Sequence, residues 1–315
     1  MPDTECRLMS CIKHGERAIM SCHKISLALG GGGARGIAHL GVISGLEEAD
    51  FEIERLVGVS IGSLAGAMYA FDPDIQDVQY RIGAYLASPA FRHYQRQLLA
   101  SQDSGDRHAV HGTSWWQKLK RFARANYVCQ QVLRQPALLP GDVLRHAVEH
   151  LLPDADLADA CVPLSIVAVD LLEGGPVILE SGSVRDAVCA SASIPGVFPP
   201  VEFQDRLLCD IGVLNSLPIL ATRQYETGCL VAVDVSSALR PISSCPSAVD
   251  VLVRMNDIGE HMSRRHVFDS ADLVIRPDVG DVPWFDFSAP VRLMQLGHEA
   301  ALSAVANIRQ RCCVC

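Results

Sequence analysis

A serine between two glycines is the residue of this chain best placed for nucleophilic chemistry. The segment Gly58-Val59-Ser60-Ile61-Gly62 follows an apolar run from Ile53 to Val59 and precedes a helical pattern from Ile61 to Ala70. Glycines remove side chains where a strand and a helix cross, so a sharp turn can hold the Ser60 hydroxyl clear of both. The helix N-terminus favours the negative charge that develops during attack on a carbonyl. The context favours a nucleophile elbow over a plain tight turn.

A serine hydroxyl needs a base, and Asp210 is the candidate. It follows the short apolar run Leu207–Cys209, which is typical of a buried strand. Partial burial at the end of such a strand disfavours the charged carboxylate and brings its pKa closer to that of a working base. Taken alone, Asp210 is better interpreted as a turn residue that ends a strand.

The run Gly30–Gly36, at the end of the apolar stretch Ile25–Leu29, is the second glycine-rich turn. Three interpretations remain open for it: an oxyanion hole made of backbone N–H groups, a nucleotide site, or tight packing. A dinucleotide site requires an acidic residue at the end of the next strand, whereas Asp50 precedes that strand. A phosphate-binding P-loop requires a Gly-Lys-Ser/Thr sequence, which this run does not have.

Together, and in this order, the three motifs resemble those of the patatin-like phospholipase family. The resemblance covers residues 24–224 and includes the segment Ala190–Pro200 and the motif Asp210-Ile211-Gly212. Length and spacing are most similar to the bacterial branch that resembles the catalytic domain of neuropathy target esterase.

The resemblance implies a serine acyl hydrolase that cleaves lipid esters through a Ser-Asp dyad and an acyl-enzyme, with no histidine, metal or cofactor. It makes Ser60 the nucleophile and Asp210 the proton acceptor. The implied substrate is a phospholipid, a lysophospholipid or another fatty-acyl ester. The oxyanion hole is assigned to Gly31, Gly32 and Gly33, and supporting roles to Ala34, Arg35, Gly36, Gly58, Gly62, Ile211 and Gly212.

Two departures from the family pattern keep other functions open. Ile211 stands where the family usually has glycine, and a positive φ there would strain a branched residue and weaken catalysis. Cys189 stands where an arginine is common. One alternative is therefore a catalytically weak lipid-binding or regulatory protein. Another is an α/β-hydrolase esterase with a Ser-Asp-His triad, whose histidine would be His261 or His298, and a nucleotide-binding module is a third.

Strands that alternate with helices along the chain predict an α/β protein, and the resemblance implies a three-layer patatin-like fold. We expect a mostly parallel central sheet with helices on both faces and a helical cap insertion. The predicted organisation is a lead-in tail over 1–22, one domain over 23–311 and a cysteine-rich tail over 312–315. Within the domain the motif-bearing core spans about 24–224, the cap about 72–151, and the C-terminal strands and helix 225–311. His39 is interpreted as a packed structural residue.

Charge and hydropathy limit the kinds of partner that the chain can have. The net charge of −9 argues against general nucleic-acid binding. The range 81–134 is nevertheless basic, with nine Arg or Lys and two Asp. Within it, 113–124 predicts a helix with Trp115, Leu119 and Phe122 on one face, suited either to peripheral membrane contact or to packing on the main domain. The chain has no signal-peptide pattern and no apolar run long enough to span a bilayer, so we expect a cytoplasmic protein, in peripheral contact with the membrane if 113–124 binds it.

The twelve cysteines do not form an obvious disulfide pattern. Cys161, Cys189, Cys209 and Cys229 sit singly in apolar runs, where a free thiol behaves as a small hydrophobe. The spacing Cys312 to Cys315 has no second pair nearby that would complete a metal site. We therefore expect reduced cysteines and no bound metal.

Overall fold

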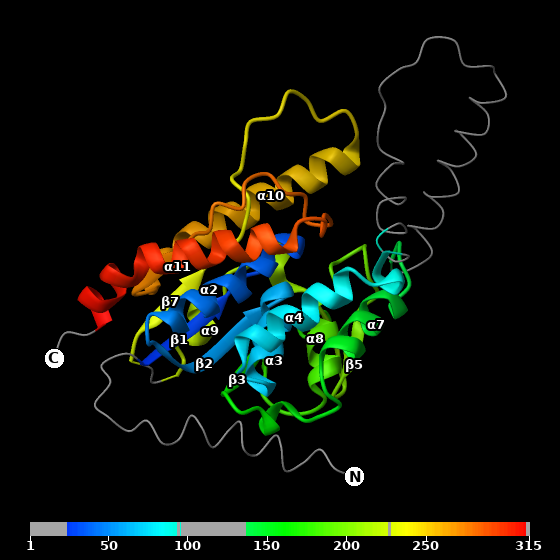
Figure 1. Cartoon of the computed structure of the whole chain (residues 1–315). Coiled ribbons are helices and arrows are strands. Elements are labelled where there is room, and N and C mark those ends of the chain that lie inside the picture. The colour runs from blue at the N-terminus through cyan, green and yellow to red at the C-terminus, as the bar shows by residue number, and fades with distance from the viewer. Residues whose placement is uncertain (1–23, 93–94, 96–136, 226–227, 313–315) are drawn as a thin grey trace, which may run out of the picture.

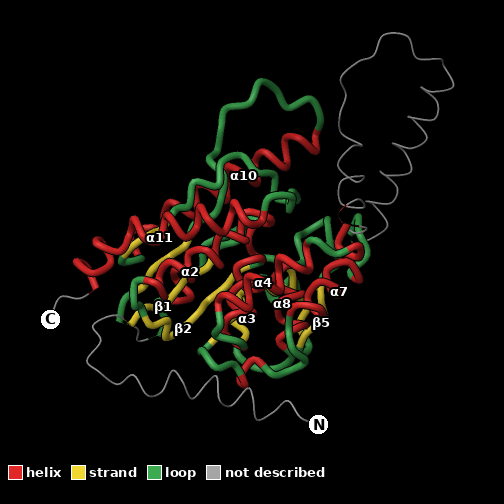
Figure 2. The backbone as a smooth tube through the Cα atoms, viewed as in Figure 1, coloured by secondary structure: helices red, strands yellow, loops and turns green. Residues whose placement is uncertain are grey.

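The computed structural model describes residues 24–92, 95, 137–225 and 228–312. Its described part is one mixed sheet with helices on both faces (Figures 1 and 2). The strands are β1 (Lys24–Leu29), β2 (Glu52–Val59), β3 (Leu164–Asp170), β4 (Gly175–Leu179), β5 (Val201–Phe203), β6 (Arg206–Cys209), β7 (Leu230–Val233) and β8 (Leu273–Ile275). The α-helices are α2 (Ala38–Glu48), α3 (Ile61–Phe71), α4 (Ile75–Leu86), α7 (Asp142–Leu151), α8 (Val184–Ala192), α9 (Ile219–Thr222), α10 (Ala248–Val267) and α11 (Pro290–Cys312). Short 3-10 turns are η1 (Gly33–Ile37), η3 (Leu157–Asp159), η4 (Ile211–Val213) and η5 (Phe268–Ser270).

The sheet has a parallel centre and an antiparallel edge. Strands β8, β7, β1, β2 and β3 are neighbours in that order and all run parallel. Strands β4 and β6 both pair antiparallel with β3, and β5 pairs antiparallel with β6. The apolar runs of β1 and β3 are buried on both faces, as expected for central strands covered by helices.

The register around β3 brings the ends of two strands together. Strand β4 pairs with residues of β3 with which β2 and β6 also pair, so β4 occupies one edge of β3. Strands β2 and β6 therefore lie one after the other along the opposite edge of β3. Along that edge Val59 of β2 pairs with Val167, and Cys209 of β6 pairs with Val169. Because β2 and β6 approach from opposite directions, Ser60 and Asp210, the next residues, meet at the level of Ala168.

Hydrophobic cores lie on both faces of the sheet. Helices α2, α3, α8 and α11 pack on one face around side chains such as Leu27 and Leu56. The other face has smaller clusters, in which α9 and the end of α10 cover Ala28 and Ala232. The predicted α/β class with a mostly parallel sheet and helices on both faces is confirmed.

Several details differ from the sequence-based expectations. The short strand β5 has no distinctive sequence pattern and was not expected. Helix α11 runs from Pro290 to Cys312, so the first cysteine of the expected 312–315 tail belongs to this helix. Most of the cap range 72–151, including 113–124, lies outside the described residues, so its boundaries stay a prediction. In the described ranges, no helix combines the length and the apolarity needed to cross a bilayer.

The expectation of reduced cysteines is wrong at three of the described positions. Cys229, next to β7, forms a disulfide with Cys312 at the end of α11, 83 residues away in sequence. Cys161 is also disulfide-bonded. Cys189 and Cys209 are free and buried, as expected. The pairing was not visible in the sequence because it depends on α11 returning across the sheet to the start of β7.

Candidate active site

Ser60 occupies the strained turn between β2 and α3. Its backbone has φ 56° and ψ −123°, a conformation that a residue with a side chain rarely adopts. The turn is held from outside, because the Ser60 N–H donates to Ser191 Oγ at 2.9 Å. The Ser191 hydroxyl in turn donates to the Val167 carbonyl at 2.7 Å, which ties the elbow to β3. The backbone thus makes a sharp strand-to-helix turn at Ser60, while the role of Ser60 as nucleophile stays a prediction.

The two glycines of the elbow are required by close backbone contacts. A Cβ on Gly62 would lie 2.3 Å from the carbonyl oxygen of Leu29, and one on Gly58 would lie 2.5 Å from the Cα of Ser63. Helix α3 therefore begins directly against the end of β1, which places the Ser60 hydroxyl at the carboxyl edge of the sheet.

Asp210 faces Ser60 from the end of β6. It is only 3% exposed, and burial raises the pKa of its carboxyl to about 6. Two hydrogen bonds act against burial and lower this pKa, one from Ser60 and one from the backbone N–H of Gly212, whose distance to Oδ1 is 2.6 Å. The backbone N–H of Asp210 donates to the Ser193 carbonyl at 2.9 Å, which fixes the end of the strand.

The glycine loop lies beside Ser60, and its three amides are not equivalent. The Gly31 N–H donates to the carbonyl of Ser216 at 2.8 Å, so it is already used within the fold. The N–H groups of Gly32 and Gly33 take part in none of the hydrogen bonds within the described ranges. The expectation that Gly31 supplies an oxyanion donor is corrected on this ground, because its N–H has a backbone acceptor. Gly32 and Gly33 remain as candidate donors.

Three contacts hold the glycine loop in place. Gly33 has φ +59°, and a Cβ there would lie 2.2 Å from the Trp284 carbonyl oxygen, so no larger residue fits. Arg35 donates from Nε to the Val235 carbonyl and from Nη1 to the Val282 carbonyl, at 3.0 and 2.9 Å. Arg35 thus holds the loop against the segments that contain Val235 and Val282.

His39 is a structural residue, as expected, and it also supports the loop. It is fully buried, and burial lowers its pKa to about 4, so the ring is neutral at physiological pH. Its Nε2 lies 2.7 Å from the Gly30 carbonyl, to which a neutral ring donates. The Nδ1 atom has no hydrogen-bond partner among the described residues. The single N–H of the neutral ring therefore positions the glycine loop through the Gly30 carbonyl.

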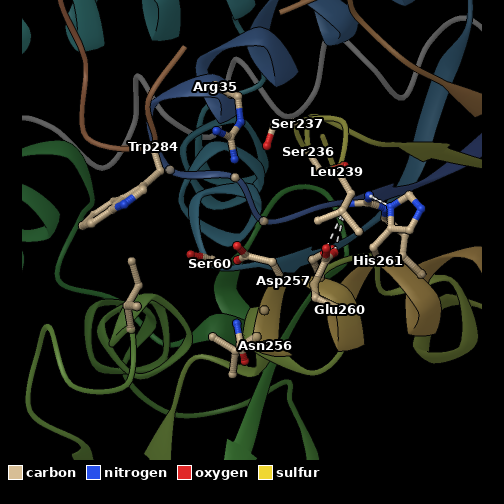
Figure 3. Close-up of a pocket in the computed structure, with 18 of the residues that line it drawn as sticks. Arg35, Ser60, Ser236, Ser237, Leu239, Asn256, Asp257, Glu260, His261 and Trp284 are labelled. Atoms are coloured by element: carbon tan, nitrogen blue, oxygen red, sulfur yellow. Dashed lines mark hydrogen bonds and ion pairs between the residues drawn. The ribbon is translucent and has the colours of Figure 1, made fainter. Parts of the chain in front are cut away.

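Ser60, Asp210 and the glycine loop share one cavity of about 310 Å³ (Figure 3). Helix α10 and the loop before it form the opposite wall. There Glu260 accepts from the Ser216 hydroxyl and pairs with Arg264, which is buried and also close to Asp234 at 3.6 Å. This chain of contacts joins α10 to the carbonyl that holds Gly31. Sequence reasoning missed Ser191, Ser216, Glu260 and Arg264, and only Ser191 lies in a segment that carried a signal, Ala190–Pro200.

Neither histidine considered as a base is placed like one. His298 lies on α11 and bonds to Glu48 on α2, with 2.7 Å between Nε2 and Oε2. His261 lines the cavity, but Figure 3 shows it on the other side from Ser60, with its Nδ1 3.2 Å from an Arg264 nitrogen. In the part of the chain that the structure describes, no cluster of three or more His, Cys, Asp or Glu side chains is arranged to hold a metal.

The strain expected at Ile211 is absent. The residue begins the 3-10 turn η4 and is not among the described residues with positive φ. Its side chain is buried with Val57, Val59, Val167 and Val169 on one face of the sheet. The branched residue therefore extends an apolar cluster, and the backbone of Asp210 keeps an ordinary φ of −63°. Cys189, the second departure, is buried, which raises the pKa of its thiol to about 12.

The family is decided by comparison with known proteins. The family model described as patatin-like phospholipase matches residues 27–223, more than half of the chain. The chain belongs to the patatin-like phospholipase family. The match begins in β1 and ends just after α9, so it contains Ser60, Asp210 and the glycine loop.

Curated relatives of the chain are between 26% and 28% identical to it over the aligned residues. It is 28% identical over 305 residues to an uncharacterized NTE family protein of Mycobacterium tuberculosis, an alignment that covers 89% of this chain and 46% of the relative. It is 26% identical over 219 residues to the lysophospholipase NTE1 of Debaryomyces hansenii, covering 70% of this chain and 12% of that protein. The chain thus spans less than half the length of these relatives. Among solved structures, VipD from Legionella pneumophila aligns at 14% identity with a TM-score of 0.43, covering 90% of this chain and 66% of VipD.

Proposed function

We propose that this patatin-like phospholipase hydrolyses fatty-acyl esters of phospholipids or lysophospholipids, with Ser60 as nucleophile and Asp210 as its only side-chain base. One observation carries the proposal: the ends of β2 and β6 bring Ser60 and the buried carboxyl of Asp210 to the same level of β3, where both line one cavity. The name of the relative NTE1, a lysophospholipase, supports a lipid ester as substrate.

In the first half-reaction Asp210 accepts the Ser60 proton while Oγ attacks the ester carbonyl carbon. The carbonyl π electrons move to its oxygen, and the N–H groups of Gly32 and Gly33 stabilise this oxyanion. Each such donor contributes on the order of 3 kcal/mol to the barrier reduction. The tetrahedral intermediate then collapses, the ester C–O bond breaks, and the leaving alcohol takes the proton from Asp210.

In the second half-reaction water replaces the leaving alcohol. Asp210 accepts a proton from the water, whose oxygen attacks the acyl carbon, and the same two amides hold the oxyanion. Collapse breaks the bond to Ser60 Oγ, which recovers its proton from Asp210, and the fatty acid leaves. Every proton is accounted for by one carboxyl group, so no histidine is needed.

The test is hydrolysis of a panel that contains a lysophospholipid, a diacyl phospholipid and a short p-nitrophenyl ester. We expect Ser60→Ala to lower turnover of every accepted substrate by about a thousandfold or more. His298→Ala, which removes a histidine outside the cavity, serves as the matched control and should keep wild-type turnover. Unchanged ester hydrolysis by Ser60→Ala would overturn the proposal.

A further inference from the structure

The start of α10 and the loop before it expose apolar side chains on several sides. Figure 1 shows this part of the chain projecting from the rest of the molecule. Between 46% and 71% of each of five side chains is exposed. We call them the α10 tip: Ile242, Val251, Leu252, Val253 and Met255. Such large apolar side chains, gathered next to one another, mark a surface with a binding role.

The distribution of the α10 tip around the helix indicates what kind of partner covers it. Consecutive residues of an α-helix are about 100° apart around the axis, so Val251, Leu252 and Val253 span about 200°. A single partner helix or groove covers one stripe of about 100°, as in an amphipathic surface helix. An apolar medium that surrounds the helix covers all three. From Pro241 to Val253 the one charged residue is Asp250, whose carboxylate is bonded to the N-cap residue Ser247.

The α10 tip adjoins the mouth of the cavity that holds Ser60. Arg240, which precedes the tip in sequence, and Arg254, which lies between Val253 and Met255, line this cavity. The Arg254 guanidinium donates to the Arg240 carbonyl at 2.7 Å. Arg240 also pairs with Asp281 at 2.9 Å, and Asp257 lies on the same wall. Arginines at the base of an apolar projection are suited to the phosphate level of a membrane, because their stems lie along apolar groups while the guanidinium stays hydrated.

The other end of α10 is fixed to the glycine loop. Arg264, only 4% exposed, pairs with Glu260 at 2.9 Å, and Glu260 accepts from Ser216, whose carbonyl holds the Gly31 amide. The helix therefore holds the α10 tip in a set position relative to the candidate oxyanion donors. A surface that binds the tip thus lies next to the cavity.

We infer that the α10 tip inserts into the headgroup and upper acyl region of a phospholipid bilayer, so that the cavity opens onto the membrane. The inference rests on the proposed function in that the membrane is also the source of the acyl ester. Burial of large aliphatic side chains in the acyl region favours binding, and a carboxylate in their place opposes insertion.

Sedimentation with vesicles of equimolar phosphatidylcholine and phosphatidylglycerol tests the inference, with all proteins in the Ser60→Ala background so that lipid is not consumed. We expect Leu252→Glu combined with Met255→Glu to weaken vesicle binding on the order of a hundredfold. The matched control is Tyr80→Glu, which changes a side chain that is 74% exposed on α4, outside the cavity, and should bind as well as the parent. If the double variant does not fold, as judged by circular dichroism, Ile242→Glu in the loop replaces it, with a loss of about tenfold expected.

Soluble ester turnover, measured with Ser60 present, separates this inference from the proposed function. The Leu252→Glu, Met255→Glu protein should hydrolyse a short monomeric ester at the wild-type rate. Vesicle binding by a chain without any esterase activity would reject the proposed function and leave the bilayer surface standing. Equal vesicle binding by the parent and the folded tip variant would overturn the inference. A second result would also overturn the inference: wild type is a dimer that does not bind vesicles, and the tip variant is a monomer. The α10 tip would then be a subunit interface.

Discussion

The carboxyl of Asp210 is held between two opposing effects. Burial at the end of β6 destabilises the charged form, while hydrogen bonds from Ser60 and Gly212 stabilise it, and the resulting pKa is about 6. A carboxylate with the ordinary pKa would be a weaker base towards a serine hydroxyl, and one that is fully desolvated without these donors would be protonated at neutral pH. The environment therefore raises the pKa of Asp210, which makes its carboxylate a stronger base, but leaves the group ionised at pH 7.

The pH dependence of hydrolysis follows from this pKa. Asp210 accepts a proton only in its ionised form, so kcat/KM for a soluble ester should be level near neutral pH. It should fall about tenfold per unit below pH 6. Rates measured with a p-nitrophenyl ester under acidic and neutral conditions check this. If the acidic fall in kcat/KM shifts to another pH or disappears in His261→Gln, the base is that histidine instead.

Stability should change with pH in the direction set by the same group. The folded-state pKa of Asp210 lies above the ordinary value of 3.8, so between pH 4 and 6 the folded state binds more protons than the unfolded state. The contribution of Asp210 to the free energy of unfolding therefore falls as pH rises through this window, by about 3 kcal/mol in all. His39 contributes with the opposite sign, because its folded-state pKa is lowered to about 4.

Urea unfolding of wild type and Asp210→Asn across this window isolates the carboxyl, since His39 is common to both. The free energy of unfolding of the variant, relative to wild type, should increase from pH 4 to 6. A constant difference would mean that Asp210 titrates with an ordinary pKa.

At the scale of elements, the site depends on how closely α3 and η1 approach the ends of β1 and β2. Gly62 lets the first turn of α3 lie against the Leu29 and Gly30 carbonyls. Gly36 likewise lets η1 lie against Ile61, whose Cγ2 would be 2.1 Å from a Cβ at residue 36. These contacts set where the elbow and the glycine loop meet, so a methyl group at either position separates them.

Two glycine substitutions within helices should have opposite effects. Gly62→Ala places a methyl group against backbone oxygens that have no room to move, and we expect a loss of several kcal/mol in the free energy of unfolding together with lower turnover. Gly83→Ala on α4 is the matched control, because a Cβ there meets nothing within 4 Å. It should stabilise the protein by up to about 1 kcal/mol. Equal stability of the two variants in urea would refute the close approach of α3.

The same elements show what sequence alone determines. The positions of Ser60 and Asp210 were predictable because each follows a short apolar run and each lies in a local motif. The use of the Gly31 amide was not, because its acceptor, Ser216, lies 185 residues further along the chain. The relaxed backbone of Ile211 was not predictable either, since the motif indicates the turn but not its φ. The antiparallel entry of β6, which brings Asp210 to Ser60, likewise depends on tertiary pairing.

At the scale of the molecule, α11 closes the sheet on one side. It packs along α2 with a close backbone approach, since a Cβ on Gly297 would lie 2.0 Å from the Ala38 carbonyl and one on Gly41 1.8 Å from that of Met294. The disulfide between Cys229 and Cys312 joins the end of α11 to the start of β7. Helix α2 carries His39, so the packing of α11 also supports the glycine loop from behind.

Loss of this disulfide should destabilise the fold. Cross-linking two residues 83 apart restricts the unfolded chain, which corresponds to roughly 4.5 kcal/mol in the chain-entropy description. We therefore expect Cys312→Ser to unfold at a lower urea concentration than oxidised wild type, and Cys229→Ser to match it. Two results together would contradict the disulfide between Cys229 and Cys312. Cys229 of folded wild type would react freely with a thiol reagent, and wild type would be no more stable than these variants.

The most direct test of the Ser60–Asp210 assignment is the rate and site of labelling by a fluorophosphonate, followed by mass spectrometry of the digested protein. We expect one adduct, on the peptide that contains Ser60, formed at least a thousandfold more slowly by Asp210→Asn and at the wild-type rate by His261→Gln. An adduct elsewhere, or a rate that depends on His261 and not on Asp210, would contradict the account.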